Sequence, residues 1–206
     1  MSTTVLAKPD YDVLNVVALK KMATANAIGV VCRRDPDAVD RTLGELAGRG
    51  MIVVAGAAAL PTDEAEPALA ASAAEYYAAV RDDPDILDLV DRFDDTNRRF
   101  LATMSAWQQV DVGGRTVAND HTDAEYDDRV ITRIDRLVQR LGPLLAGLST
   151  YDRCFEVYGE RFEVAMRGAD SGQRDLISSP MHDSVHNIWF EFHEDLLRTL
   201  GRERKE

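Results

Sequence analysis

The stretch RRDPDAVDRTLGELAGRGMIVVAG, residues 33–56, decides the fold of this chain. Asp35 is placed to cap a helix, and Pro36 suits the first helical position because its missing N–H needs no partner there. Apolar residues then recur at three- and four-residue spacing, at Val39, Leu43 and Leu46. This periodicity predicts an amphipathic helix that ends in the Gly-Arg-Gly segment before the apolar run.

Around this helix the order of elements indicates a winged helix-turn-helix domain. MIVVAG (51–56) is expected to be a short strand, and two helices are predicted upstream, over 10–22 and 23–31, with Thr24 as a possible N-cap. Three helices and a strand, with a short turn before the third helix, are the winged-helix order. A generic three-helix bundle is the alternative.

The rest of the chain is predicted to be helical. Helical spacing of apolar residues extends over about 85–109, 123–146 and 151–168, and a last helix is expected to begin at Ser179. The segment VDVGGRTVANDHTD (110–123) is expected to be a loop with a Gly-Gly turn.

The predicted fold class is therefore mainly α, with two domains. A winged helix-turn-helix domain would occupy residues 1–65, and an antiparallel helical bundle would occupy residues 66–206.

The charge distribution argues against DNA binding. The net charge is −12, and residues 1–49 are nearly neutral. From Gly50 to Val80 there is no Lys or Arg, so the predicted wing has no cation for a phosphate, although phosphate contacts supply most non-specific affinity. The only local basic cluster is Lys20, Lys21, Arg33 and Arg34. We therefore expect DNA binding to be unlikely and the domain to dock on a protein.

Several classes of protein are not indicated. The apolar stretches are shorter than a membrane span of roughly 20 residues, and no secretory signal is visible. Cys32 and Cys154 form no metal or redox spacing, which predicts a reduced, cytoplasmic setting. Walker, GxSxG and GxGxxG motifs are absent, and we expect neither a cofactor nor a metal.

Polar residues within apolar patterns are the candidate site. Asn97 interrupts an apolar helix face, which predicts either an interhelical hydrogen bond or a ligand contact. In NDHTD (119–123), His121 beside carboxylates could be a general base, although helix capping is the alternative. On the last predicted helix, His182, His186 and His193 share one flank; the pattern favours packing, and a small-molecule pocket or a metal site are the alternatives.

The chain resembles an actinobacterial family of winged-helix, MarR-like proteins of about 200 residues. The resemblance rests on WQ (107–108), NDHTD-x-x-YD (119–127) and DS-x-H-x-x-WFE-x-HEDLL (183–197), and departs from the family at Val185, where an aromatic residue is usual. It implies association with dikinase-like phosphotransferases related to phosphoenolpyruvate synthase and pyruvate phosphate dikinase. Some of these enzymes phosphorylate phenolic compounds at the entry to aromatic catabolism.

Two functional hypotheses follow from the residues and the resemblance. In the first, the chain is a non-DNA-binding accessory subunit of a dikinase-like catalytic subunit and contributes the site for a small, phenolic acceptor. In the second, it is a ligand-responsive, MarR-like transcriptional regulator. The oligomeric state stays open, with a homodimer among the options. The predicted catalytic residues are His121 and His186, and the predicted ligand-binding residues are Asn97, Trp107, Asn119, Asp120, Asp183, Trp189 and His193.

Overall fold

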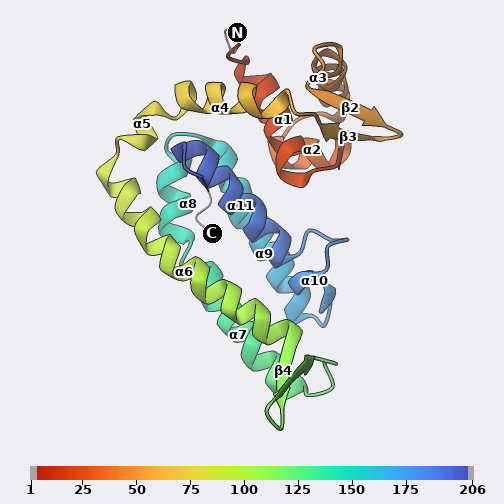
Figure 1. Cartoon of the computed structure of the whole chain (residues 1–206), viewed down its shortest axis with the longest axis vertical. Coiled ribbons are helices and arrows are strands. Elements are labelled where there is room, and N and C mark those ends of the chain that lie inside the picture. The colour runs from red at the N-terminus through yellow and green to blue at the C-terminus, as the bar shows by residue number, and fades with distance from the viewer. Residues whose placement is uncertain (1–3, 204–206) are drawn as a thin grey trace. The chain divides into compact units, whose positions relative to one another are not determined.

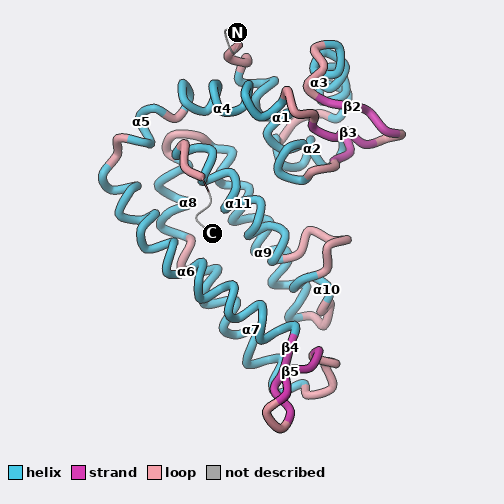
Figure 2. The backbone as a smooth tube through the Cα atoms, viewed as in Figure 1, coloured by secondary structure: helices cyan, strands magenta, loops and turns pink. Residues whose placement is uncertain are grey.

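The computed structural model describes residues 4–203, which divide into two compact units. The first unit comprises the chain up to Asp82 and again from Glu191 onward, and the second unit comprises Asp83–Phe190. Helices dominate both units, which confirms the mainly α class (Figure 2). The alanine-rich helix α4 (Ala65–Tyr76) packs on α1 of the first unit, and the predicted domain boundary after residue 65 stays a prediction.

The first unit begins with three helices and a small antiparallel sheet (Figure 1). Its elements are α1 (Lys8–Lys20), β1 (Ala23–Thr24), α2 (Ala25–Cys32), α3 (Pro36–Gly48), β2 (Ile52–Ala55) and β3 (Ala58–Pro61). The strand order is β1-β3-β2, so β2 is an edge strand. Two predicted caps are confirmed: the Thr24 hydroxyl accepts the Ala27 N–H, and the Asp35 carboxylate accepts the Asp37 N–H.

The core of the first unit forms between α1 and the elements that cover it. Helix α1 packs against α2, α3, β3 and α4, which buries Tyr11, Leu14 and Val17 almost completely. A buried polar contact joins α1 to the last helix, α11 (Val185–Leu200): Asn15 Nδ2 donates to Asp195 Oδ1 at 2.8 Å. The short helix α5 (Ala78–Arg81) follows α4.

The second unit consists of helices and one hairpin. Its elements are α6 (Pro84–Gln108), β4 (Gln109–Val112), β5 (Arg115–Ala118), α7 (Ala124–Gln139), α8 (Gly142–Ser149), η1 (Arg153–Phe155), α9 (Glu156–Asp170), α10 (Asp175–Ser178) and the part of α11 up to Phe190. Helix α6 packs on α7 and α8, and α9 packs on α7, α8 and α10.

The single helix predicted over 123–146 is wrong, because the chain forms α7 and α8 there. Pro143 explains the break: its ring would clash with the carbonyl of Gln139, and it has no N–H to donate. The helix predicted over 151–168 begins later and ends later than expected. The short helix η1 occupies its first residues, and α9 continues past Gly168 to Asp170.

The last helix begins at Val185, so its predicted start at Ser179 is also wrong. The Ser184 hydroxyl accepts the Asn187 N–H at 3.3 Å, as an N-cap does. The Asn187 side chain then donates to the carbonyls of Ser179 and His182, which holds the preceding residues in a loop. His182 therefore lies outside the helix and does not share a helical flank with His186.

The segment 110–123, expected to be a loop, contains an antiparallel hairpin (Figure 2). Strands β4 and β5 pair Val110 with Val117 and Val112 with Arg115. Gly113 and Gly114 both have positive φ, as the two-residue type I′ turn requires.

Within residues 4–203, none of the helices combines the length and the apolar character that a membrane crossing requires.

Candidate functional site

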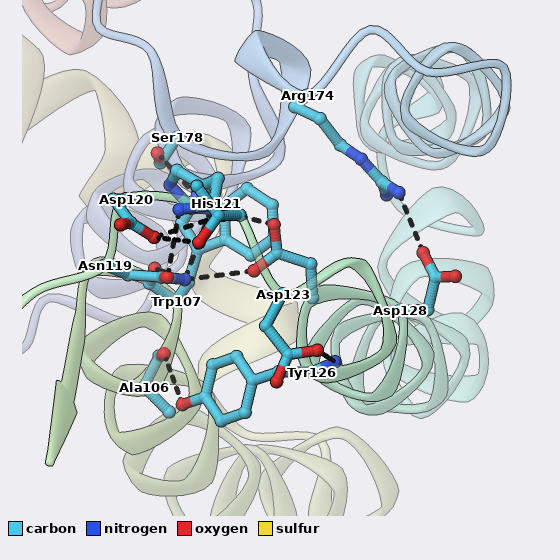
Figure 3. Close-up of polar contacts among 12 residues, drawn as sticks. Ala106, Trp107, Asn119, Asp120, His121, Asp123, Tyr126, Asp128, Arg174 and Ser178 are labelled. Atoms are coloured by element: carbon cyan, nitrogen blue, oxygen red, sulfur yellow. Dashed lines mark hydrogen bonds and ion pairs between the residues drawn. The ribbon is translucent and has the colours of Figure 1, made fainter. Parts of the chain in front are cut away.

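The strongest candidate site lies where the hairpin returns to the end of α6 (Figure 3). It joins Trp107 of α6, Asn119 and His121 of the loop after β5, and Asp127 of the first turns of α7. The sequence predicted three of these residues as site residues. All of them belong to the second unit, and hydrogen bonds and ring contacts bring them together.

Asn119 organises this cluster through its side-chain amide. Its Nδ2 donates to the Trp107 carbonyl at 3.0 Å and to Asp127 Oδ1 at 3.0 Å, and its Oδ1 accepts the His121 backbone N–H. Its backbone N–H donates to the Gln108 carbonyl. Asn119 thus connects the end of α6 to the start of α7.

The amide hydrogens of Asn119 determine the tautomer of His121. An amide NH₂ has two hydrogens, and those of Asn119 are directed to Trp107 and Asp127. Asn119 therefore has no further amide hydrogen to donate across the 3.2 Å contact between its Nδ2 and His121 Nδ1. His121 Nδ1 carries a hydrogen of its own and donates a hydrogen bond to Asp127 Oδ2 at 2.9 Å.

This arrangement leaves His121 Nε2 as the basic nitrogen. Among residues 4–203, Nε2 has no hydrogen-bond partner, and 38% of the side chain is exposed. The Asp127 side chain is only 3% exposed, so its carboxylate is shielded from solvent. A buried carboxylate that holds Nδ1–H while Nε2 faces outward is the geometry of a histidine general base.

The backbone and the rings restrict His121 further. Its φ is +58°, in the left-handed region that a non-glycine residue enters at a cost of roughly 1–2 kcal/mol. Its ring centroid lies 4.4 Å from that of Trp107 at a tilt of 39°. Trp107 is 2% exposed, and its Nε1 donates to the Ser178 hydroxyl at 3.1 Å.

The remaining residues of NDHTD have local roles. Asp120 accepts hydrogen bonds from the Thr122 hydroxyl and the Thr122 N–H, and these bonds lower the pKa of Asp120. Asp123 accepts the Tyr126 N–H and caps α7, which is the helix capping that the sequence offered as the alternative for NDHTD. Capping explains Asp123 and a local turn explains Asp120, and neither explains the geometry of His121.

A second group of predicted residues surrounds Trp189. Its ring stacks on Phe100 with centroids 3.9 Å apart and an interplanar angle of 4°. Its Nε1 donates to Asn97 Oδ1 at 2.9 Å, so Asn97 makes the interhelical hydrogen bond that was one of its two predicted roles. His186 lies 6.4 Å from the Phe100 ring, and burial lowers the pKa of His186.

The structure separates the other predicted residues from these groups. Asp183 makes a two-pronged ion pair with Arg161, at 2.6 and 2.7 Å, and the Arg161 side chain is 5% exposed. His193 is half-buried on the part of α11 that belongs to the first unit. The small-molecule pocket that was one of the predicted roles of the histidine flank stays a prediction.

Asp127 is the important residue that the sequence prediction missed. It lies in the first turns of α7, where acidic residues commonly face solvent and complement the helix dipole. Its spacing of six residues after His121 in an irregular loop gives no regular phase from which contact could be predicted.

In the first unit, the surface of α3 and the β2–β3 hairpin is acidic and apolar. Asp37, Asp40 and Glu45 are exposed on α3 together with one cation, Arg41, and Arg49 at the end of the helix pairs with Asp10 at 3.2 Å. On the edge strand β2, two neighbouring valines are more than half exposed: Val53 at 57% and Val54 at 54%.

No family model, no curated protein and no solved structure matches this chain.

Proposed function

We propose that this chain is the accessory subunit of a dikinase-like phosphotransferase, in which His121 removes the proton of a small acceptor's hydroxyl. The observation that carries the proposal is the Asp127–His121 pair, with Nδ1–H on the buried carboxylate and Nε2 without a partner among the described residues. The phosphotransferase partner and a phenolic acceptor come from the sequence resemblance, so they are tested separately below.

The chemistry divides between the two subunits. The partner would supply ATP and a phosphohistidine. The acceptor oxygen forms a bond to phosphorus while the phosphorus–nitrogen bond of the partner breaks, and the hydroxyl proton moves to His121 Nε2. Asp127 stabilises the resulting imidazolium, as a buried carboxylate does in a catalytic triad.

The rings at this position favour an aromatic acceptor. The buried Trp107 ring lies against the His121 ring and positions it, and the partly exposed imidazole gives the π face that an aromatic acceptor could contact. His186 makes no ion pair among residues 4–203, and burial already lowers its pKa, so we assign the base to His121.

We also propose that residues 1–65 form a winged helix that docks on the catalytic subunit instead of DNA. The α2-turn-α3 arrangement and the β1-β3-β2 sheet support the fold. The exposed acids of α3 would repel phosphates, whereas the exposed valines of β2 give apolar area for a protein interface.

The direct test is acceptor phosphorylation by the assembled complex. The tagged chain would be purified from its native cells, the co-purifying dikinase-like chain identified by mass spectrometry, and phosphoester formation from ATP and phenol followed by ³¹P NMR. We expect His121→Ala to reduce kcat by about 100-fold or more, as loss of a general base does. The variant also leaves the buried Asp127 carboxylate with one hydrogen bond fewer, so its melting temperature is measured and kcat is compared at a temperature at which both proteins are folded.

Controls separate catalysis from folding. His182→Ala changes an exposed loop histidine outside the cluster and should leave kcat unchanged. Asp127→Asn should lower kcat, because the new side-chain amide can donate to His121 Nδ1. The imidazole hydrogen would then move to Nε2, which could no longer accept the proton of the acceptor. Equal activity of His121→Ala and the unchanged protein would refute the base.

The alternative function is a ligand-responsive, MarR-like regulator, which the helix-turn-helix arrangement of α2 and α3 favours. It predicts sequence-specific DNA binding that a phenolic ligand weakens. Such binding, without a co-purifying dikinase-like chain, would replace the phosphotransferase proposal.

A further inference from the structure

A cavity of about 380 Å³ lies among α7, α8 and α9, entirely within the second unit. None of the residues of the His121 cluster lines it, so it is a separate feature. Its volume falls in the range of small-molecule sites, roughly 300–1,000 Å³.

The floor of this cavity is apolar. Leu145, Phe162 and Met166 contribute side chains that are nearly buried. Gly159 widens it: a Cβ built there would meet only Leu145 Cδ1, at 4.0 Å. The missing side chain of a mid-helix glycine therefore leaves room for apolar atoms of a ligand.

The rim of the cavity has excess negative charge. Asp135, Glu163 and Asp170 line it together with one cation, Arg167. Glu163 pairs with Arg167 at 3.1 Å. Asp135 accepts only a neutral amide hydrogen, from Gln139, and Asp170 makes no ion pair among residues 4–203. Two carboxylates thus remain without a cation beside an apolar floor.

We propose that this cavity binds a lipophilic organic monocation, with an ammonium centre on an aromatic or branched aliphatic body. The apolar body would displace water from Leu145 and Met166, while the ammonium would lie near Asp135 and Asp170. An anion is disfavoured by the two carboxylates. A docked peptide helix is disfavoured by size, because stable protein interfaces bury more than about 1,000 Å².

A second cavity, of about 330 Å³, provides an internal comparison. It lies along α6 and the start of α8 and is lined by two arginines, Arg92 and Arg140, and one aspartate, Asp95. It has no excess of negative charge, so a cation should select the cavity of α7, α8 and α9.

The test uses matched probes on the full chain. Phenyltrimethylammonium is the cation, tert-butylbenzene is its neutral isostere, and benzenesulfonate is the anion, each titrated by ¹H–¹⁵N NMR. We expect the cation to bind at least about tenfold more tightly than the isostere, with shifts at Gly142, Gly159 and Arg167. Equal affinity of the cation and the isostere would overturn the proposal, as would tighter binding of benzenesulfonate.

Two sets of variants locate the site. Gly159→Leu should fill the cavity and abolish cation binding, whereas the matched helical change Gly44→Leu, with nothing within 4 Å of its Cβ, should not. Asp135→Asn with Asp170→Asn should weaken the cation about tenfold and leave the isostere unchanged. Because these aspartates are at the surface rim, their variant keeps the test valid if Gly159→Leu does not fold. Cation binding that neither variant alters would place it elsewhere and refute the site.

Discussion

The hydrogen bond from Trp189 to Asn97 should contribute measurably to the stability of the second unit. Asn97→Leu removes the acceptor of an indole N–H on a residue that is only 2% exposed. A buried donor left without a partner costs about 1–3 kcal/mol. The helix propensity of leucine exceeds that of asparagine by a few tenths of a kcal/mol, which offsets part of this cost. We therefore expect the free energy of unfolding to fall by about 1–2 kcal/mol.

A double-mutant cycle isolates this hydrogen bond from other effects. Trp189→Phe removes the N–H but also disturbs the stack on Phe100, and this packing cost cancels in the cycle. In the Trp189→Phe background, Asn97→Leu should cost close to zero, which gives a coupling energy of about 1–2 kcal/mol.

The assay is urea denaturation followed by far-ultraviolet circular dichroism, because Trp189→Phe removes one of the two tryptophans. A melting shift of about 2–4 °C per kcal/mol would be an independent check for a chain of this size. Equal costs of Asn97→Leu with and without the Trp189 indole would refute the hydrogen bond as the role of Asn97. Asn97→Leu that leaves stability intact but abolishes acceptor phosphorylation would assign Asn97 to ligand contact instead.

Three further predictions concern DNA, pH and thiol reactivity. No duplex DNA should bind at about 150 mM salt, because α3 and β2 offer no excess of cations; a gel shift with the chain's own upstream region at sub-micromolar protein would contradict this. Burial lowers the pKa of His186, so the folded state binds fewer protons than the unfolded state, and stability should fall as pH falls below about 6.5; His186→Gln should reduce that slope, and an unchanged slope would assign it to other groups. Burial raises the pKa of Cys32 to about 12, so iodoacetamide at pH 8 should modify this thiol about a thousand-fold more slowly in the folded chain than in the urea-unfolded chain. Mass spectrometry of the labelled peptide would give both rates, and equal rates would mean that the thiol is accessible and its pKa unperturbed.

Local signals predicted the elements that local chemistry determines. Thr24 and Asp35 cap helices as expected, because a short polar side chain before an apolar period has few other roles, and Asp123 does the same for α7. Gly201 ends α11 with φ of +64°, as a left-handed C-terminal residue does. The mainly α class follows from these signals.

The prediction errors have equally specific causes. The apolar period continues through residues 123–146, but Pro143 outweighs it and divides α7 from α8. Ser179 and Ser184 are both suitable caps, and only the contacts of Asn187 select Ser184. The β4–β5 hairpin does have a signal in the sequence, since Gly113-Gly114 follows alternating valines, but a Gly-Gly turn is equally compatible with a loop.

The candidate site could be predicted only in part, because it depends on a contact between segments. Trp107, Asn119 and His121 are identifiable as unusual residues, whereas the burial of Asp127 arises only when the hairpin returns the chain to α6. The pairing of β4 with β5 aligns Gln109 with Ala118, which brings Asn119 to the carbonyls of Trp107 and Gln108. A one-residue change in this register would remove the contact.

The positive φ of His121 supports a role for this loop beyond capping because it is combined with a buried carboxylate partner, whereas Lys21 and Arg33 have similar φ values at the ends of helices. Capping needs Asp123, and the turn needs Asp120, but neither requires His121 to adopt φ of +58° against a buried carboxylate. Strained backbone persists only where surrounding contacts hold it. Here Asn119 and Asp127 both do so, and the result is an imidazole whose tautomer is fixed and whose Nε2 is directed away from them. A loop that served only to start α7 could use glycine at this position without strain. His121→Gly should nevertheless lower stability, because it leaves the buried Asp127 carboxylate with one hydrogen bond fewer, and it should abolish the proposed proton transfer. A gain in stability would mean that the Asp127–His121 pair does not hold the loop.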